Sequence, residues 1–200
     1  MKEKFLIVLK FIIFVCLIPV VIAATRGFVE QMSSIPDVLR AFFLWGIFVY
    51  IFVHVFICEP KELYAYGQKI VSQIFRFFAP LVEVAPYFLP IYAILLLIIF
   101  YFVVLIFKAG EYGRYFMFML SFFLTMHFTF TAKQLRAKEE NALKPNYFFS
   151  ISIIYIANIV LLSLFLDLII DSFSFVELFT AITRQTEGIY STIFHQLFLS

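Results

Sequence analysis

Apolar residues follow one another without a polar interruption in more than one part of the chain. One such run covers residues 94–107, and a shorter one covers residues 153–157. Transmembrane strands alternate apolar and polar positions, so unbroken runs argue against a barrel. Inside a bilayer only helices and closed barrels satisfy the backbone hydrogen bonds. The runs therefore predict membrane-spanning helices.

The composition supports the same interpretation. The chain of 200 residues is 64% hydrophobic and 14% charged, whereas a soluble domain is about half apolar and about a quarter charged. We expect an all-α, polytopic integral membrane protein that forms a single transmembrane domain over residues 1–200. The net charge of +2 gives no indication of nucleic-acid binding.

About five stretches are apolar and long enough to cross the bilayer, since a span needs about 20 mostly apolar residues. They are residues 5–24, 38–57, 87–107, 115–132 and 147–170. Polar residues 25–37, 108–114 and 133–146 connect them, and Pro80, Pro86 and Pro90 are expected to break the chain. The tail, residues 171–200, has apolar side chains at helical spacing, which predicts an amphipathic helix on the membrane surface.

Residues 1–24 could also be a signal peptide, because basic residues precede an apolar stretch that ends in Ala23 and Ala24. The apolar stretch is long for that role, so a retained first helix is favoured. Cys16 and Cys58 lie in or beside apolar runs. We interpret them as small core residues rather than as disulfide partners.

Residues 61–79 have a helical pattern that is only partly apolar. Lys61, Glu62, Lys69 and Arg76 lie in this segment, and each charge costs about 2.5–3.5 kcal/mol at the centre of a bilayer. If the segment does not cross, most basic residues fall in cytoplasmic loops, as is usual. If it crosses, the basic loop 133–146 falls outside. We therefore expect a re-entrant or interfacial helix, five spans and a cytoplasmic amino terminus.

Four polar side chains are predicted to lie within the spans: His54, His127, Asn158 and Asp167. Intramembrane polar residues are natural candidates for function. His54 and His127 could share a depth, but no third ligand is expected beside them, so a zinc site is not favoured. Packing histidines are the favoured interpretation, and a proton relay through Asp167, Asn158 and His127 remains open. No catalytic motif or cofactor site is recognised.

One region resembles bacterial site-2-protease-like membrane metallopeptidases. The resemblance rests on Phe43-Leu44-Trp45-Gly46, Tyr50, His54, Pro60, residues 63–67 with their Tyr-x-x-Gly element, and residues 85–92. It extends over roughly residues 44–179 and implies a helical membrane fold in a bacterial inner membrane. In that family the Tyr-x-x-Gly element leads into a His-Glu-x-x-His zinc helix.

The chain departs from this family at the zinc motif itself. Gln68, Lys69 and Ser72 stand where the family has His, Glu and His, so the zinc ligands and the general base are missing. The resemblance therefore implies a non-catalytic relative: a scaffold or accessory subunit of a membrane protein complex, or a homo-oligomer, that requires no cofactor. Gln68, Ser72 and Gln73 form a candidate groove for a partner or lipid. The alternative is a small transporter or channel subunit.

Overall fold

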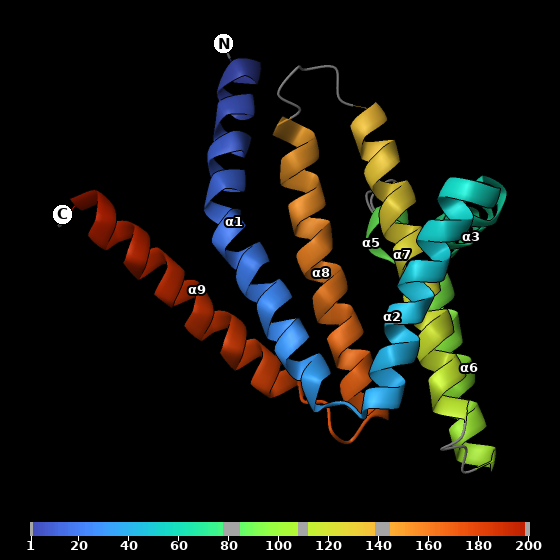
Figure 1. Cartoon of the computed structure of the whole chain (residues 1–200). Helices are drawn as coiled ribbons and strands as arrows, with labels where there is room; N and C mark the ends of the chain where they lie inside the picture. Colours follow the sequence, from blue (N-terminus) through green and yellow to red (C-terminus); the bar gives the residue numbers. More distant parts are fainter. Residues whose placement is uncertain (1, 78–84, 108–111, 139–144, 199–200) are drawn as a thin grey trace. The chain divides into compact units, whose positions relative to one another are not determined.

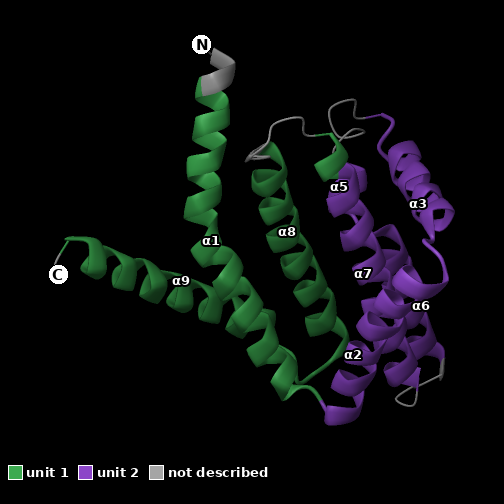
Figure 2. Cartoon of the chain, turned by 45° about the horizontal axis from the view of Figure 1, so that its top comes forward, with its two compact units in different colours: residues 1–35, 135–200 green, residues 36–134 purple. Residues whose placement is uncertain are grey.

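The computed structural model describes residues 2–77, 85–107, 112–138 and 145–198. Within these ranges 91% of the residues are helical and no strand occurs, so the expected all-α class is confirmed. Outside the described ranges lie Phe78, Ala79 and Pro80, most of the 108–114 turn, and residues 139–144 of the later loop. The chain divides into two compact units, residues 1–35 with 135–200 and residues 36–134 (Figure 2). Each unit is described by itself.

Unit 1 contains α1 (Lys2–Ser34), α8 (Pro145–Ile169) and α9 (Phe175–Phe198). Helices α1 and α8 run parallel, side by side (Figure 1). Near their beginnings Lys10 Nζ donates to Asn146 Oδ1 at 2.8 Å, and at their far ends Ser34 Oγ donates to the carbonyl of Ser172. Lys10, which lies within an apolar stretch, thus has a polar partner on the neighbouring helix.

Helix α1 corrects one prediction, because it continues through residues 25–34, which the sequence indicated as a polar connection. No proline occurs there before Pro36. The polar residues are accommodated by side-chain bonds: Thr25 Oγ1 bonds to Tyr155 of α8 at 2.8 Å, and Gln31 Nε2 donates to Glu177 of α9 at 3.0 Å. Tertiary partners therefore support a helix that a hydropathy pattern ends too early.

Helix α9 lies against α1 and runs in the opposite direction (Figure 1). A Cβ added to Gly27 of α1 would lie only 3.2 Å from Leu178 and 3.3 Å from Ile182, so the glycine allows close packing. The tail is helical as expected. Several of its other apolar side chains, including Val176, Phe179, Phe194, Leu197 and Phe198, are exposed. The placement of α9 on a membrane surface stays a prediction.

Unit 2 contains the other elements. They are α2 (Asp37–Phe52), a π-helical turn (Val53–Ile57), α3 (Lys61–Ile74), α5 (Ala85–Phe88), α6 (Ile91–Phe107) and most of α7 (Gly113–Ala137). Helices α2 and α7 are parallel. A Cβ on Gly46 would collide with Ser121 and with the Phe118 carbonyl of α7. Eight residues after Gly46 in the chain, the His54 side chain contacts Lys133 of α7. Gly46 thus lets the two backbones approach closely, as small residues do between membrane helices.

Helix α6 runs antiparallel to α7. The rings of Tyr92 and Phe123 lie 5.4 Å apart, and those of Phe100 and Phe116 lie 4.1 Å apart. The predicted span 87–107 is wrong at its beginning, because α5 ends at Phe88 and α6 starts only at Ile91. Pro90, which lacks a backbone N–H, stands at this break.

Helix α3 lies at one end of unit 2, where α2 and α7 end and α6 begins (Figure 1). Tyr92 Oη of α6 donates to the Leu63 carbonyl of α3 at 2.6 Å. A Cβ on Gly67 would lie 2.7 Å from the Tyr92 ring and 2.8 Å from Ile91. The helix has 14 residues and is therefore about 21 Å long, which is shorter than the bilayer core of about 30 Å.

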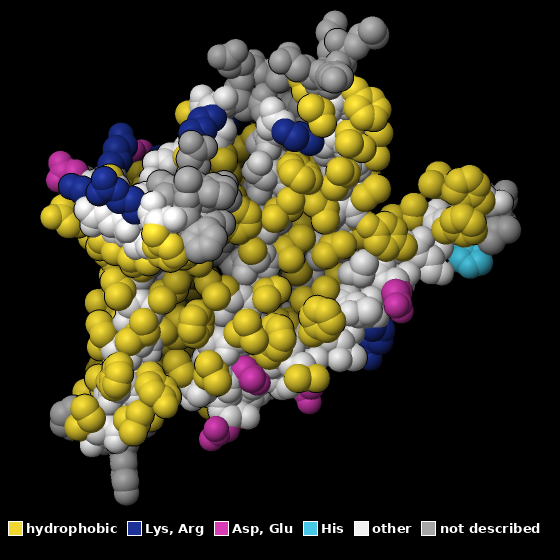
Figure 3. Space-filling model, turned by 180° about the vertical axis from the view of Figure 1, so that it is seen from behind, with side chains coloured by type: hydrophobic (Ala, Val, Ile, Leu, Met, Phe, Trp, Pro, Cys, Tyr) yellow, Lys and Arg dark blue, Asp and Glu magenta, His cyan; other side chains and the backbone are white. Residues whose placement is uncertain are grey.

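Among the residues that the structure describes, four helices are long and apolar enough, by length and composition, to cross a membrane. They are the stretches Phe5–Ser34, Asp37–Ile57, Gly113–Ala137 and Asn146–Ile169; a shorter apolar helix covers Ile91–Ile106. Hydrophobic side chains cover much of the face shown in Figure 3. Lys and Arg side chains gather at the end of unit 2 that carries α3, at the left of that view. The chain is thus a helical protein whose long apolar helices suit a membrane.

Candidate functional site

A row of polar side chains follows one face of α7. Ser121, Thr125, Thr129 and Lys133 are spaced four residues apart and therefore lie one above the other. The hydroxyls of Thr125 and Thr129 each donate to the carbonyl four residues earlier. The residues that face this row are Gly46 and Tyr50 of α2 and His54 of the π-helical turn, also four apart. The contact between this part of the chain and α7 therefore includes polar side chains beside aromatic ones, such as the pair Tyr50–Phe122.

The end of this interface holds a directional chain of hydrogen bonds. Lys133 Nζ lies 2.9 Å from His54 Nε2, and His54 Nδ1 lies 3.2 Å from Tyr50 Oη. An ammonium group only donates, so Nε2 accepts and the neutral imidazole donates from Nδ1 to Tyr50. The Tyr50 hydroxyl continues the chain to Thr129. His54 lies in the π-helical turn, a feature often found at functional sites.

Glu59 connects the α2–α3 junction to α7. Its carboxylate accepts from Lys133 Nζ at 2.7 Å and from Lys61 Nζ at 2.9 Å. The hydrogen bond from Lys133, followed by that from Lys61, lowers the pKa of Glu59 to about 2. The carboxylate therefore stays charged over the physiological range and holds both lysines at this end of the unit.

A second polar group ties α3 to α7. Tyr64 Oη bonds to Thr131 Oγ1 at 3.0 Å and accepts from Gln68 Nε2 at 2.6 Å. Gln68 and Gln134 also exchange bonds, at 3.0 Å from Gln68 Nε2 to Gln134 Oε1 and 3.3 Å in the other direction. Burial raises the pKa of Tyr64 to about 12, so its hydroxyl stays protonated and can serve as both donor and acceptor.

An aromatic stack separates the two histidines of this region. The rings of Tyr64 and Phe130 are stacked with centroids 5.0 Å apart. His54 packs edge-on against Phe130 at 5.5 Å, and His127 lies 6.1 Å from Tyr64 on the other side. The structure thus brings His54 and His127 to one neighbourhood, as expected from their depths, but each has its own partners.

A small pocket lies beside Gln68, with an empty volume of about 260 Å³ including its open mouth. Its lining residues with polar side chains are Tyr64, Gln68, Tyr92 and His127, and the others are apolar, with Leu89, Pro90, Phe123 and Met126 among them. His127 is only 5% exposed, and its Nε2 lies 3.1 Å from the Tyr87 carbonyl.

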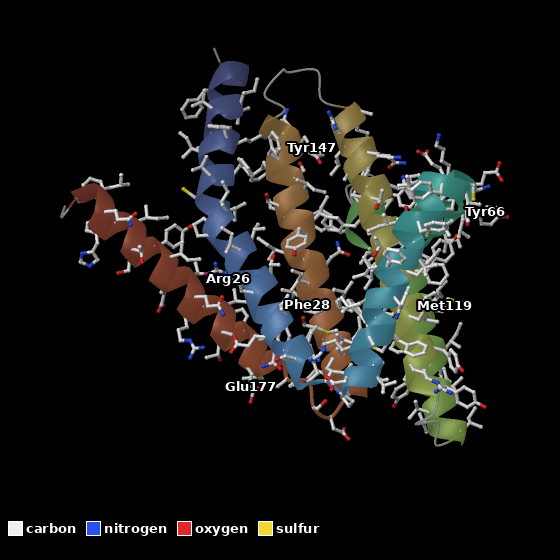
Figure 4. The ribbon with its side chains drawn as sticks, viewed as in Figure 1. Arg26, Phe28, Tyr66, Met119, Tyr147 and Glu177 are labelled. Atoms are coloured by element: carbon white, nitrogen blue, oxygen red, sulfur yellow. The ribbon has the colours of Figure 1, made fainter. Side chains whose placement is uncertain are left out.

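The three residues of the candidate partner groove have different environments. Gln68 faces α7 and is bonded there, Ser72 is half-buried, and Gln73 is exposed. Lys69 and Tyr66 of α3 are also exposed, and Tyr66 points outward from the helix (Figure 4). An exterior partner would therefore meet Gln73 first, because the Gln68 amide already has partners within unit 2.

The remaining intramembrane polar residues belong to unit 1. Asn158 Nδ2 donates to the Ile154 carbonyl of its own helix at 2.8 Å. Asp167 is exposed, and its Oδ1 accepts from the backbone N–H of Phe175 at 3.0 Å. That N–H is one of the unpaired donors at the beginning of α9, so Asp167 acts as a cap. Both residues thus have hydrogen-bond partners within unit 1.

The polar network of unit 2 was missed in the sequence, although part of its signal is visible there. The four-residue spacing of Ser121, Thr125, Thr129 and Lys133, and that of Tyr50 with His54, mark one face of each helix. Their pairing depends on the parallel arrangement of the helices, which spacing does not give. Within the described residues no three His, Cys, Asp or Glu side chains gather as a metal site would require.

Comparisons with known proteins add no relative: no family model, no curated protein and no solved structure matches the chain.

Proposed function

We propose that the protein is a non-catalytic membrane protein that acts as a scaffold or accessory subunit. The observation that carries this proposal is that the Gln68 side chain is hydrogen-bonded within unit 2. This residue stands where the metallopeptidase family has its first zinc ligand, and its amide is used in bonds to Tyr64 and Gln134. A side chain engaged in this way fixes α3 against α7 instead of presenting a ligand to a metal.

Kinship with site-2-protease-like enzymes would make this chain a pseudoprotease of the bacterial inner membrane. Lys69 is exposed, so it presents a cation where the family has its general base. Ser72 is a weak ligand, and neither it nor Lys69 replaces the missing carboxylate. We expect the purified protein to hold no stoichiometric zinc. Elemental analysis that found one tightly bound zinc per chain, lost in His54→Ala or His127→Ala, would overturn this assignment.

The proposed topology has five spans, with α3 at the cytoplasmic side as a non-spanning helix. Two pairs of neighbouring helices support it. Because α2 and α7 are parallel, the chain must cross the membrane an even number of times between the end of α2 and the end of α7. Helices α6 and α7 supply two crossings, and a crossing by α3 would make the number odd. Parallel α1 and α8 require an odd number of spans from the first to the last, and five satisfies this. Lys61, Lys69 and Lys133 lie at the end of unit 2 proposed to be cytoplasmic.

Cysteine labelling tests this topology. In a variant without Cys16 and Cys58, a cysteine at Glu187 should react with a membrane-impermeant reagent added outside, and a cysteine at Glu140 should react only after the membrane is opened. Labelling of position 140 but not 187 in intact cells would refute the orientation.

The partner is proposed to meet the outer face of α3. A photo-cross-linking amino acid at Gln73 should give a discrete protein adduct in native membranes, whereas one at Trp45, 58% exposed on α2, serves as the control and should give lipid adducts. Ser72→Leu should weaken the Gln73 adduct without changing membrane insertion. Only lipid adducts at Gln73 would count against a scaffold role.

A transporter subunit is the second candidate, favoured by the bond chain from Lys133 through His54 and Tyr50 to Thr129. The chain ends at backbone carbonyls of α7, and this ranks it below the scaffold. Proton flux in liposomes that contain only this protein, lost in His54→Ala, would reverse the order.

A further inference from the structure

The exposed side of α3 carries a stripe of polar side chains. Its members alternate between four and three positions apart, the spacing that lines residues up along one side of a helix in a coiled-coil seam. They are Glu62, Tyr66, Lys69, Gln73 and Arg76, and all are exposed. Arg76 follows the last turn, where its backbone N–H still donates to the Gln73 carbonyl. The stripe therefore lies on the outer face of α3, where Tyr66 points outward (Figure 4).

The charges of this stripe are unpaired and of mixed sign. Among the residues that the structure describes, none forms an ion pair with Glu62, Lys69 or Arg76. A segment that binds an anionic lipid surface usually carries about four to eight basic residues, and such a surface would repel Glu62. The stripe instead has a carboxylate near its beginning and a guanidinium at its end, so its charge pattern is complementary to its own reverse.

We propose that this stripe is an interface with a second copy of the chain, in which the two α3 helices are antiparallel about a two-fold axis at Lys69. Glu62 of each copy then faces Arg76 of the other, and Tyr66 faces Gln73. A two-fold interface uses the same patch on both subunits, so each of these contacts occurs twice. The two Lys69 side chains meet at the axis, and their flexible stems let the ammonium groups separate into water.

The antiparallel arrangement agrees with the proposed topology. Two copies inserted in the same orientation are related by a two-fold axis along the membrane normal. Such an axis keeps spanning helices parallel to their copies and turns a helix in the membrane plane end for end, and α3 is the helix proposed not to span. The inference thus rests on the proposed function, for which it names the partner at the outer face of α3 as a second copy.

A photo-cross-linking amino acid at Gln73 of the full-length protein identifies the occupant in native membranes. The expected adduct has twice the mass of the chain. An adduct with a different protein and none between copies would overturn the second copy and leave the accessory role standing. Adducts with lipid alone would count against both proposals.

Charge reversal tests the register, measured as energy transfer between labelled copies in liposomes at increasing lipid dilution. Glu62→Arg and Arg76→Glu should each weaken the dimer about three- to thirtyfold, because each turns two exposed ion pairs into repulsions. An equal mixture of the two variants should regain the wild-type affinity, since the new arginine of one copy then faces the new glutamate of the other. Glu187→Arg, on exposed α9, is the control and should leave the dimer unchanged.

The axis itself gives a change in the opposite direction. Lys69→Gln removes the like charges that meet there, so it should strengthen the dimer about twofold or more. A weaker dimer in this variant would refute the register, as would two charge-reversal variants that do not recover on mixing. Wild-type copies that stay monomeric at every lipid dilution would overturn the proposal whether or not the variants fold.

Discussion

The hydroxyl of Tyr64 is expected to contribute measurably to stability, because it is the shared partner of two side chains. Tyr64 is 4% exposed, and its Oη bonds to Thr131, which is fully buried, and to Gln68. Tyr64→Phe removes the hydroxyl and keeps the ring that stacks on Phe130. The loss is thus polar and leaves the aromatic packing in place.

Its magnitude follows from the groups left behind. A buried hydrogen bond contributes about 0.5–1.5 kcal/mol net, and bonds between membrane helices average about 0.6 kcal/mol, reaching about 1.7 kcal/mol. Gln68 keeps its bonds to Gln134 in the variant, which limits the cost. We therefore expect Tyr64→Phe to lower the free energy of unfolding by about 1 kcal/mol, within these ranges.

Reversible unfolding in mixed micelles, followed by circular dichroism as the denaturing detergent is titrated, measures this difference. Tyr66→Phe is the matched control, because Tyr66 lies on the same helix and is 70% exposed, and it should change stability by less than about 0.5 kcal/mol. In a double-mutant cycle, Thr131→Val should cost less in the Tyr64→Phe background than in the wild-type protein. Equal effects of Tyr64→Phe and Tyr66→Phe, or strictly additive effects in the cycle, would refute the reasoning.

Three further predictions concern charge, packing and metal. The low pKa of Glu59, about 2, means that its ion pairs stabilise the fold above its unfolded pKa of about 4.3 and lose this effect as the pH falls toward 2. The stability difference between wild type and Glu59→Gln should therefore shrink on acidification, whereas Glu62→Gln, also on the surface, should show no such trend. Gly46→Ala should cost about 1–3 kcal/mol by overpacking, while Gly188→Ala, with nothing within 4 Å of the added Cβ, should be tolerated; both are measured by the same titration. Elemental analysis of the purified protein should find no stoichiometric zinc.

The sequence predicts the apolar helices well because hydropathy depends on each residue and its neighbours. Helices α2, α7 and α8 lie within a few residues of the predicted spans 38–57, 115–132 and 147–170. Each of the two errors of this kind has an identifiable cause. Residues 25–34 continue α1 because partners on other helices satisfy their polar groups, and Pro90 delays the beginning of α6.

The candidate site was predictable only in part. His54 and His127 were selected because they are polar residues in apolar surroundings, and both lie beside the stack of Tyr64 on Phe130. The partners of His54 were not predictable, because Lys133 comes from a helix 79 positions later in the chain. The π-helical turn that carries His54 also has no sequence signature, and it changes which residues share a face.

These polar contacts lie between helices because the composition implies a lipid environment for the helices. Between two helices in a bilayer, an apolar side chain gains little from leaving lipid for protein, so packing specificity depends on close backbone approach and on polar bonds. Both kinds of contact are made with α7 in unit 2. Gly46 lets the backbone of α2 approach α7 closely, and the Tyr64–Thr131 and Gln68–Gln134 hydrogen bonds attach α3 to α7. Apolar length therefore predicts which segments are membrane helices, whereas a few glycines and polar side chains determine which of them become neighbours.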